Sequence, residues 1–396
     1  MPDVFTSTSS TSWGSNLFGS IKSVFFGFIL FVASVPLLFW NEGRAVRTSK
    51  GLTEGQGAVV SVPSDSVDAG KEGKLVHTSG NVKTESPLAD DQLGVQATAV
   101  KLIRNVEMFQ WKEHEKSESR KKIGGGTETV TTWEYKKEWA DGRIDSSKFK
   151  YPEEHQNPEA PPFETKTFVA DKVTVGAFSM SAEQVGQLSN AKDLPLDGAA
   201  AEQLPAEAKD RFKVSGGKFY AGDDPGAPKV GDIRVSFQVV NPATVSLVGV
   251  QTGQSFTAYQ TSTGTSILLV EEGNLTAQQM FKKAQDANTF LTWLVRGGGF
   301  FLMFIGIFLL FRPIVVFADV LPIFGTMLGA GIGLFAFLGA AILSFLTIAT
   351  AWVFYRPLIG IAMLALAVGA FYWLVSVGRK KKAVRAAALV PSPATV

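Results

Sequence analysis

Cysteine is absent from this chain of 396 residues. Its absence excludes disulfide bonds, thiolate metal ligands, iron–sulfur clusters and a cysteine nucleophile. The three histidines, His77, His114 and His155, lie far apart and show neither H-x-x-x-H nor H-E-x-x-H spacing. The G-x-S-x-G motif of hydrolases and the glycine–lysine spacing of phosphate-binding loops are also missing. We therefore predict no catalytic residues, no metal site and no cofactor, and we expect that the protein is not an enzyme.

A charge excess is also lacking. The 38 Lys and Arg residues nearly balance the 36 Asp and Glu residues, so the net charge is +2. This balance excludes the strongly basic surface that is typical of nucleic-acid-binding proteins, and we predict no nucleic-acid partner. The charges are unevenly distributed, because residues 41–289 hold most of them and residues 290–378 hold few. This distribution indicates a membrane protein with a water-facing domain.

The first long apolar run has no charged side chain between residues 24 and 40. As a helix it would be about 25 Å long, close to the ~30 Å hydrocarbon core of a bilayer. Trp40 ends the run, where interfacial aromatic residues are common. A cleaved signal peptide is the alternative. However, Lys22 is the only basic residue before the apolar core, and no small-residue cleavage motif follows the core. We predict a flexible, Ser/Thr-rich tail at 1–20 and a transmembrane helix at 21–40.

The middle of the chain, residues 41–289, predicts a soluble domain rich in β-strands. Segments with alternating or β-branched residues, such as 129–139, are separated by Gly, Pro, Asp and Ser, which favours a largely antiparallel sheet. Helical patterns occur at 182–190, at 205–212 and at 276–290, where Thr276 is a candidate N-cap. An aromatic group is predicted to form core, with a partner-binding face as the alternative; its members are Phe109, Trp111, Trp133, Tyr135 and Trp139.

The apolar C-terminal part, residues 290–378, predicts three more transmembrane helices at about 291–311, 328–352 and 358–378, with a short interfacial segment at 314–322. The basic tail at 379–396 is expected in the cytoplasm under the positive-inside rule. Four spans then place the domain on the opposite, extracytoplasmic (periplasmic or lumenal) side. The predicted fold class is an α+β membrane protein, with a β-rich extracytoplasmic domain on a four-helix transmembrane base.

Two groups of residues are candidate sites of packing or binding. At the membrane junction, Gly43 can adopt a left-handed conformation that ends the first helix, and Arg44 can contact phosphate headgroups. This junction is predicted to dock the domain on the membrane, with a ligand site as the alternative; its residues are Trp40, Asn41, Glu42, Gly43 and Arg44. Gly325, Gly329 and Gly333 would form one small-residue stripe on a helix, for packing or, alternatively, for lining a pore or lipid slot.

Three charges lie within or beside the C-terminal apolar segments: Arg296, Asp319 and Arg356. A charge at the bilayer centre costs about 3 kcal/mol, so such residues usually face protein or water. Arg296 can extend to the interface or have a partner inside the membrane. Asp319 is predicted to be a solvated carboxylate at a helix end. Arg356 precedes Pro357, which interrupts the helical pattern.

Several stretches match a known family in order and spacing. They are NEGRA (41–45), TSKGLTEG (48–55), VHTSG (76–80), GVQATAVKLIRNVEMFQW (94–111), YPEEHQNP (151–158), VGDIRVSF (230–237) and AWVFYRPL (351–358). Over residues 20–378 the chain resembles the LUMA, or transmembrane protein 43, family. The resemblance implies one N-terminal span, a large non-cytosolic domain and three C-terminal spans. It also implies a role in organising membrane protein complexes, and no catalytic residues are established for the family.

From these observations we expect a non-enzymatic scaffold whose partners are membrane lipids, other copies of itself and other membrane proteins. An ion channel or transporter is one alternative, suggested by the Gly-rich spans and the charges near the membrane. An enzyme acting on lipid is another, suggested only by the polar junction after Trp40. The resemblance implies the endoplasmic reticulum and inner nuclear membrane for a eukaryotic chain. The lack of cysteine and the alanine-rich composition indicate a bacterial source, for which the inner membrane is expected.

Overall fold

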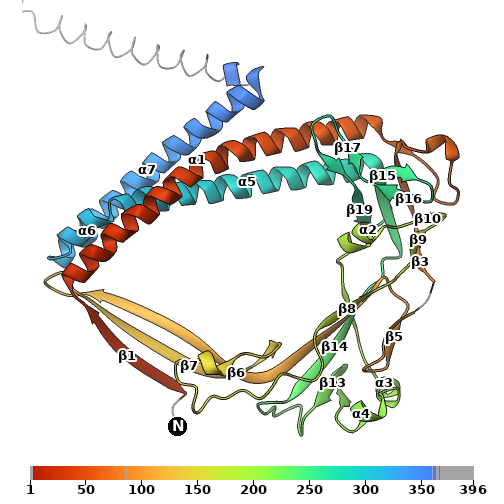
Figure 1. Cartoon of the computed structure of the whole chain (residues 1–396), viewed down its shortest axis with the longest axis horizontal. Coiled ribbons are helices and arrows are strands. Elements are labelled where there is room, and N and C mark those ends of the chain that lie inside the picture. Colours follow the sequence, from red (N-terminus) through yellow and green to blue (C-terminus); the bar gives the residue numbers. More distant parts are fainter. Residues whose placement is uncertain (1–2, 86, 359, 363–364, 366–396) are drawn as a thin grey trace, which may run out of the picture. The chain divides into compact units, whose positions relative to one another are not determined.

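The computed structural model describes residues 3–85, 87–358, 360–362 and 365 (Figure 1). The chain divides into two compact units. Unit 1 comprises Met1–Ser12 and Lys50–Asp286, and unit 2 comprises Trp13–Ser49 and Ala287–Val396. Unit 1 overlaps the segment 41–289, for which the sequence predicts a water-facing domain, and it also includes the first residues of the chain.

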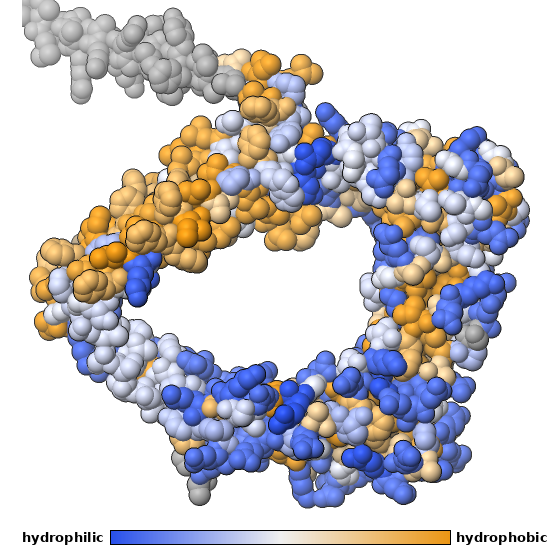
Figure 2. Space-filling view, in the orientation of Figure 1, coloured by the Kyte–Doolittle hydropathy of each residue, from blue (hydrophilic) through white to orange (hydrophobic). Residues whose placement is uncertain are grey.

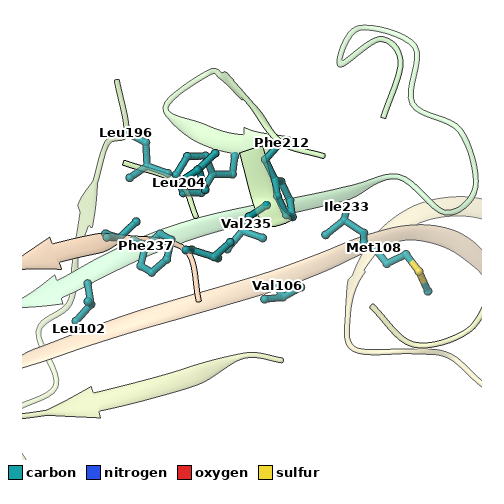
Figure 3. Close-up of a cluster of buried hydrophobic side chains, with 13 residues drawn as sticks. Leu102, Val106, Met108, Leu196, Leu204, Phe212, Ile233, Val235 and Phe237 are labelled. Carbon is teal, nitrogen blue, oxygen red and sulfur yellow. The ribbon is translucent and has the colours of Figure 1, made fainter. Parts of the chain in front are cut away.

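Unit 1 is built on two sheets, and the larger one has the order β1-β7-β6-β14-β13-β12, with β11 beside β14 and β8 beside β6. Its strands are β1 (Val4–Thr11), β6 (Lys101–Lys121), β7 (Thr127–Asp141), β8 (Lys166–Val169), β11 (Lys192–Leu194), β12 (Lys213–Ser215), β13 (Lys218–Ala221) and β14 (Ile233–Val240). Alternate residues of β6 from Leu102 to Gln110 are buried, because successive side chains of a strand point to opposite faces. Figure 3 shows the resulting core, in which Val106 and Met108 of β6 lie near Val235 and Ile233 of β14.

Strand β1 corrects the expectation of a flexible tail at 1–20. Val4–Thr11 pairs antiparallel with β7 along its whole length, from Val4 opposite Glu134 to Thr11 opposite Thr127. The β-branched threonines of this segment suit a strand, and the edge of β7 supplies hydrogen-bond partners for its backbone. Phe5 anchors the strand by stacking on Tyr151, with ring centroids 4.4 Å apart. The Ser/Thr-rich composition suggested disorder because it carries no sign of a partner strand that lies far away in the sequence.

The second sheet of unit 1 has the order β10-β9-β3-β15-β16, with β19 beside β15 and β2 beside β3. Its strands are β2 (Val60–Ser61), β3 (Leu75–Thr84), β9 (Val173–Val175), β10 (Phe178–Ser179), β15 (Thr244–Thr252), β16 (Ser255–Thr257) and β19 (Leu269–Glu272). Two small ribbons complete the strands of unit 1: β4 (Leu88–Asp90) with β5 (Val95–Ala97), and β17 (Tyr259–Gln260) with β18 (Ser266–Ile267). Apart from the parallel contact of β2 with β3, the described pairings are antiparallel, so the predicted sheet-rich domain is confirmed.

The short helices of unit 1 are α2 (Ala182–Gln187), α3 (Gly198–Glu202) and α4 (Ala206–Lys209). The patterns at 182–190 and 205–212 predicted α2 and α4. Helix α2 begins at a capping box, in which the Ser181 hydroxyl accepts from the Gln184 backbone N–H while the Gln184 side chain accepts from the Ser181 N–H. Leu204 and Phe212, on either side of α4, cover the core of the larger sheet (Figure 3).

The aromatic group of the larger sheet does not form a single core. Only Tyr135 is fully buried, with 2% of its surface exposed. The Trp111, Trp133 and Trp139 rings are half-buried, and each has a cation over it: Lys137, Lys150 and Arg234, respectively. Each cation covers a face of its ring. A partner-binding surface, the alternative interpretation of this aromatic group, would need these ring faces to be open.

His77 of β3 is a buried titratable group of unit 1, with 7% of its surface exposed. Its Nε2 lies 2.8 Å from the Leu275 carbonyl oxygen, which can only accept, so Nε2 carries the proton. Nδ1, 3.1 Å from the Ser61 hydroxyl, is then the acceptor of that contact. The neutral ring is thus fully satisfied, and burial lowers the pKa of His77.

We expect unit 1 to lose stability as the pH falls below about 6.5, the ordinary pKa of histidine. In that range the unfolded chain binds a proton that the buried His77 resists, so acid favours unfolding, whereas the contribution of His77 is complete above it. The measurement is thermal unfolding of the full-length protein between pH 5 and 7.5, followed by circular dichroism. His77→Gln should flatten the dependence. An equally steep pH dependence in both proteins would contradict this assignment.

Unit 2 consists of helices, and three in the described part of the chain are long and apolar enough to cross a membrane. They are α1 (Trp13–Ala58), α5 (Ala277–Leu310) and α7 (Pro322–Tyr355), and the short α6 (Arg312–Ala318) lies between the last two. Figure 2 shows the apolar surface of these helices. Among their exposed side chains are Phe301 and Phe345. The fourth expected span, 358–378, lies outside the described residues except for 358, 360–362 and 365, and the expected basic tail at 379–396 lies wholly outside them.

Helix α1 extends well beyond Trp40, where the sequence predicted its end. Gly43 has a helical rather than a left-handed conformation, and the helix continues to Ala58. Good helix formers such as Glu42, Arg44 and Ala45 follow the apolar run, so a change from apolar to polar residues does not end the helix here. Gly43 is instead a point of close approach: a Cβ there would lie 2.5 Å from the ring of Tyr355.

The three long helices share a small core made of Leu38, Met303, Ile307, Ala336 and Ala340. Helices α1 and α5 approach each other closely at Gly27 and Gly306. A Cβ at Gly306 would lie 2.7 Å from the backbone nitrogen of Phe31, and one at Gly27 would lie 2.8 Å from the carbonyl oxygen of Gly306. Contacts this short between backbones are possible only for glycine, as in other tightly packed membrane helices.

The predicted glycine stripe on α7 has only a partial packing role within the described residues. A Cβ at Gly325 would collide with Asp319, and one at Gly329 would touch Val315 at 3.4 Å. Gly333 has no described atom within 4 Å of such a Cβ. The spacing of four residues identified a smooth helix face correctly, but it could not show which neighbour that face meets.

Candidate functional site

The polar centre of unit 2 is an ion pair between Glu42 of α1 and Arg296 of α5. Arg296 Nε lies 2.6 Å from Glu42 Oε1, and Nη2 lies 2.8 Å from Oε2. The Glu42 side chain is 1% exposed and that of Arg296 is 15% exposed. This bidentate arrangement matches the planar guanidinium to the planar carboxylate. Of the two predicted alternatives for Arg296, the structure shows a partner inside the helix bundle.

Trp352 connects the third helix to this pair. Its indole Nε1 donates to Glu42 Oε2 at 2.8 Å, so the carboxylate accepts hydrogen bonds from α5 through Arg296 and from α7 through Trp352. The Arg296 guanidinium lies 4.6 Å from the centre of the Trp293 ring and 5.8 Å from that of Trp352. The indole rings of Trp293 and Trp352 thus flank the ion pair of Glu42 and Arg296 within an apolar helix bundle.

A second group of hydrogen bonds lies directly beside the ion pair and also joins α1 to α5. Arg44 donates from Nη1 to Asn288 Oδ1 at 2.9 Å, and from Nη2 to Thr292 Oγ1 at 3.0 Å and Asn41 Oδ1 at 3.1 Å. Asn41 Nδ2 donates to the Thr292 carbonyl at 3.1 Å, and Asn288 Nδ2 donates to the Ala45 carbonyl at 3.0 Å. Arg44 therefore contacts protein groups where the sequence suggested phosphate headgroups.

We call the residues Asn41, Glu42, Arg44, Asn288, Thr292, Arg296 and Trp352 the charge cluster. The contributions of α5 recur every four residues, at 288, 292 and 296, which places them on one face of the helix. That polar row inside an apolar segment is the signal that could have identified the partner of Glu42 from the sequence. The sequence does not indicate that Trp352 contacts Glu42, because a tryptophan near the end of a span is also typical of the membrane interface.

Of the other predicted site residues, Trp40 remains 53% exposed and takes no part in the charge cluster. Arg356 caps the C-terminus of α7, and its guanidinium lies 5.9 Å from the centre of the Trp352 ring. Asp319 differs from the prediction of a solvated carboxylate, because it is only 4% exposed. Pro322 starts α7 three residues later, and this tight connection from α6 brings the Asp319 side chain against Gly325.

The charge cluster suits a structural role better than a chemical one. Both oxygens of Glu42 accept charge-assisted or indole hydrogen bonds, so proton transfer would first have to break the ion pair. The described residues contain no group of three or more His, Cys, Asp or Glu side chains that could bind a metal ion. What the arrangement does is hold three apolar helices in one register through buried polar contacts, whose loss would leave a charge unpaired.

Comparison with known proteins gives consistent matches over most of the chain. A family model described as Transmembrane protein 43 matches residues 108–357. Mouse Transmembrane protein 43 is 36% identical over 346 residues, 85% of each chain, and human Transmembrane protein 43 is 34% identical over 355 residues, 87% of each chain. A Drosophila melanogaster homolog is 32% identical over 357 residues, 88% of this chain and 93% of its own. No solved structure matches. With the family model covering more than half of its length and curated relatives matching nearly end to end, the chain belongs to the transmembrane protein 43 family.

Proposed function

We propose that this protein is a non-enzymatic membrane scaffold that assembles with copies of itself and with other membrane proteins. The observation that carries the proposal is the closed charge cluster. Glu42 and Arg296 satisfy each other, and Arg44 is held by three neutral oxygen acceptors. Groups bound in this way stabilise a fixed helix arrangement, whereas a transport pathway or an enzyme needs polar groups that are free to exchange partners.

Two kinds of surface support assembly. On α7, the glycine face around Gly333 is open among the described residues, and small residues allow the close approach of a second helix. In unit 1, β1 and β12 form the edges of the larger sheet, and an edge strand offers backbone groups to a partner strand. The placement of unit 1 outside the cytoplasm remains part of the proposal, since it rests on the charge distribution along the chain.

Self-assembly can be tested by native mass spectrometry of the full-length protein in lipid nanodiscs. We expect a defined oligomer for the wild type and a shift toward monomer for Gly333→Leu. The matched control is Gly331→Leu, which also fills open space but lies on a different face of α7. A wild-type monomer, or an equal effect of both substitutions, would contradict assembly through this face.

Ion flux in proteoliposomes separates the scaffold from a channel or transporter. Folded, oligomeric protein should give no flux above that of empty liposomes. Flux whose ion selectivity changes in Arg296→Ala or Asp319→Ala would overturn the scaffold proposal and make those residues part of a pathway. Turnover of added lipid that a single polar substitution abolishes would instead support the lipid-enzyme alternative.

A further inference from the structure

A groove of about 340 Å³ lies between α5 and α7 within unit 2. Its lining is mostly apolar. Besides the polar Arg296 and Ser344 it includes Trp293, Gly297 and Phe300 of α5 and Phe337, Ala341 and Phe345 of α7. The rings of Phe300 and Phe337, which both line the groove, meet edge to face with centroids 5.4 Å apart. Along α7 the lining extends from Phe337 to Ile348, which is about 16 Å of helix, close to one leaflet of a ~30 Å hydrocarbon core.

The groove has a positive charge where Trp293 and Gly297 line it. Arg296 lines it, and Arg356 approaches the same Trp352 ring that Arg296 contacts. With Arg44 counted, this region holds three guanidinium groups and one carboxylate, that of Glu42, which pairs with Arg296, so its net charge is positive. Arg296 uses Nε and Nη2 for Glu42, which leaves Nη1 without a hydrogen bond to any described residue. Arg356 makes only its ring contact among the described side chains.

An apolar groove about as long as one leaflet, which ends near a group of side chains with a net positive charge, complements an amphipathic anion. We propose that this groove binds one phospholipid with an anionic headgroup. One acyl chain would lie between α5 and α7, and the phosphate would accept hydrogen bonds from Arg356 and from Nη1 of Arg296. Guanidinium–phosphate bonds are strong and geometrically matched, and they gain strength at the edge of an apolar region. The site is independent of the proposed self-assembly, because one chain supplies all of its lining.

The headgroup half of the site is tested with Arg356→Gln in the full-length protein. Native mass spectrometry would count phosphatidylglycerol and phosphatidylcholine retained from equimolar mixed micelles. We expect the wild type to retain one phosphatidylglycerol with about tenfold preference, and Arg356→Gln to lose most of that preference. Arg312→Gln, which removes an exposed arginine at the start of α6, is the matched control and should leave the preference unchanged.

The chain half of the site is tested with Gly297→Leu against Gly298→Leu. Neither glycine has a described atom within 4 Å of an added Cβ, so both variants should fold, but only Gly297 lines the groove. Gly297→Leu should reduce lipid retention about tenfold, and Gly298→Leu should not. Equal retention of both lipids by the wild type, or unchanged binding in both Arg356→Gln and Gly297→Leu, would overturn the proposal. A change of oligomeric mass in Gly297→Leu, with lipid retention intact, would overturn it in favour of a second copy in the groove.

Discussion

Replacing Glu42 with alanine should destabilise unit 2 by about 3–5 kcal/mol, one of the two largest effects we expect from a single substitution. The substitution leaves the Arg296 guanidinium buried without its carboxylate and removes the acceptor of the Trp352 indole. Leaving a buried charge without a partner costs the protein far more stability than the net contribution of the original pair, because the desolvation of that charge is no longer offset. The measurement is denaturant unfolding of the purified protein in detergent, followed by helical circular dichroism.

The double variant Glu42→Met with Arg296→Met separates the effect of the two charges on stability from the effect of the space that the two side chains fill. Methionines of similar length remove both charges at once, so the double variant should lose less stability than the sum of the two single variants. Trp352 would still lack an acceptor, so the recovery should be incomplete. Additive effects of the two substitutions on unfolding in detergent would mean that Glu42 and Arg296 do not interact.

Gly306→Leu is expected to prevent the normal packing of α1 against α5. The atoms around an added Cβ at this position belong to the backbone, namely Phe31 N at 2.7 Å and Gly27 O at 2.9 Å. Backbone atoms cannot move aside as a flexible side chain can, so the helices must separate. Overpacking typically costs about 1–3 kcal/mol, and we expect Gly306→Leu to lose about 3 kcal/mol or more.

Gly14→Leu is the control for Gly306→Leu, since Gly14 also lies in a helix of unit 2 but has no described atom within 4 Å of an added Cβ. Both proteins would be compared by resistance to unfolding in sodium dodecyl sulfate. Similar resistance of Gly306→Leu and the wild type would show that α1 and α5 do not cross at Gly27 and Gly306.

The sequence predicted the parts of the fold that local pattern determines. Apolar runs located the membrane helices that the structure describes, and alternation with turn residues predicted the sheet-rich domain. It failed where a distant partner decides the conformation. Residues 4–11 became a strand only because β7 offers an edge, and α1 continued past Trp40 because the polar residues that follow it bind α5.

In the candidate site too, local patterns could be predicted from the sequence and contacts between distant residues could not. Glu42 and Arg296 were both recognised as notable residues, yet 254 positions separate them and no local pattern joins them. The glycine stripe on α7 was visible because its members recur every four residues. Gly27 and Gly306, where the backbones of α1 and α5 come close, do not belong to such a four-residue repeat. Contacts of this kind depend on how helices far apart in the sequence are placed, which spacing within one helix does not encode.

A disulfide test between α1 and α5 addresses the central claim, that these helices pack in the register that places Glu42 against Arg296. Leu38 lies one turn before Glu42, and its Cγ is 2.7 Å from an ideal Cβ at Gly299. The chain has no cysteine of its own, so Leu38→Cys with Gly299→Cys introduces the only two thiols. After oxidation in membranes and proteolysis between the helices, we expect two fragments that stay linked until reduction, and no link for Leu38→Cys with Gly298→Cys. Equal linking of both pairs, or linking of the Gly298 pair alone, would contradict this register and with it the charge cluster.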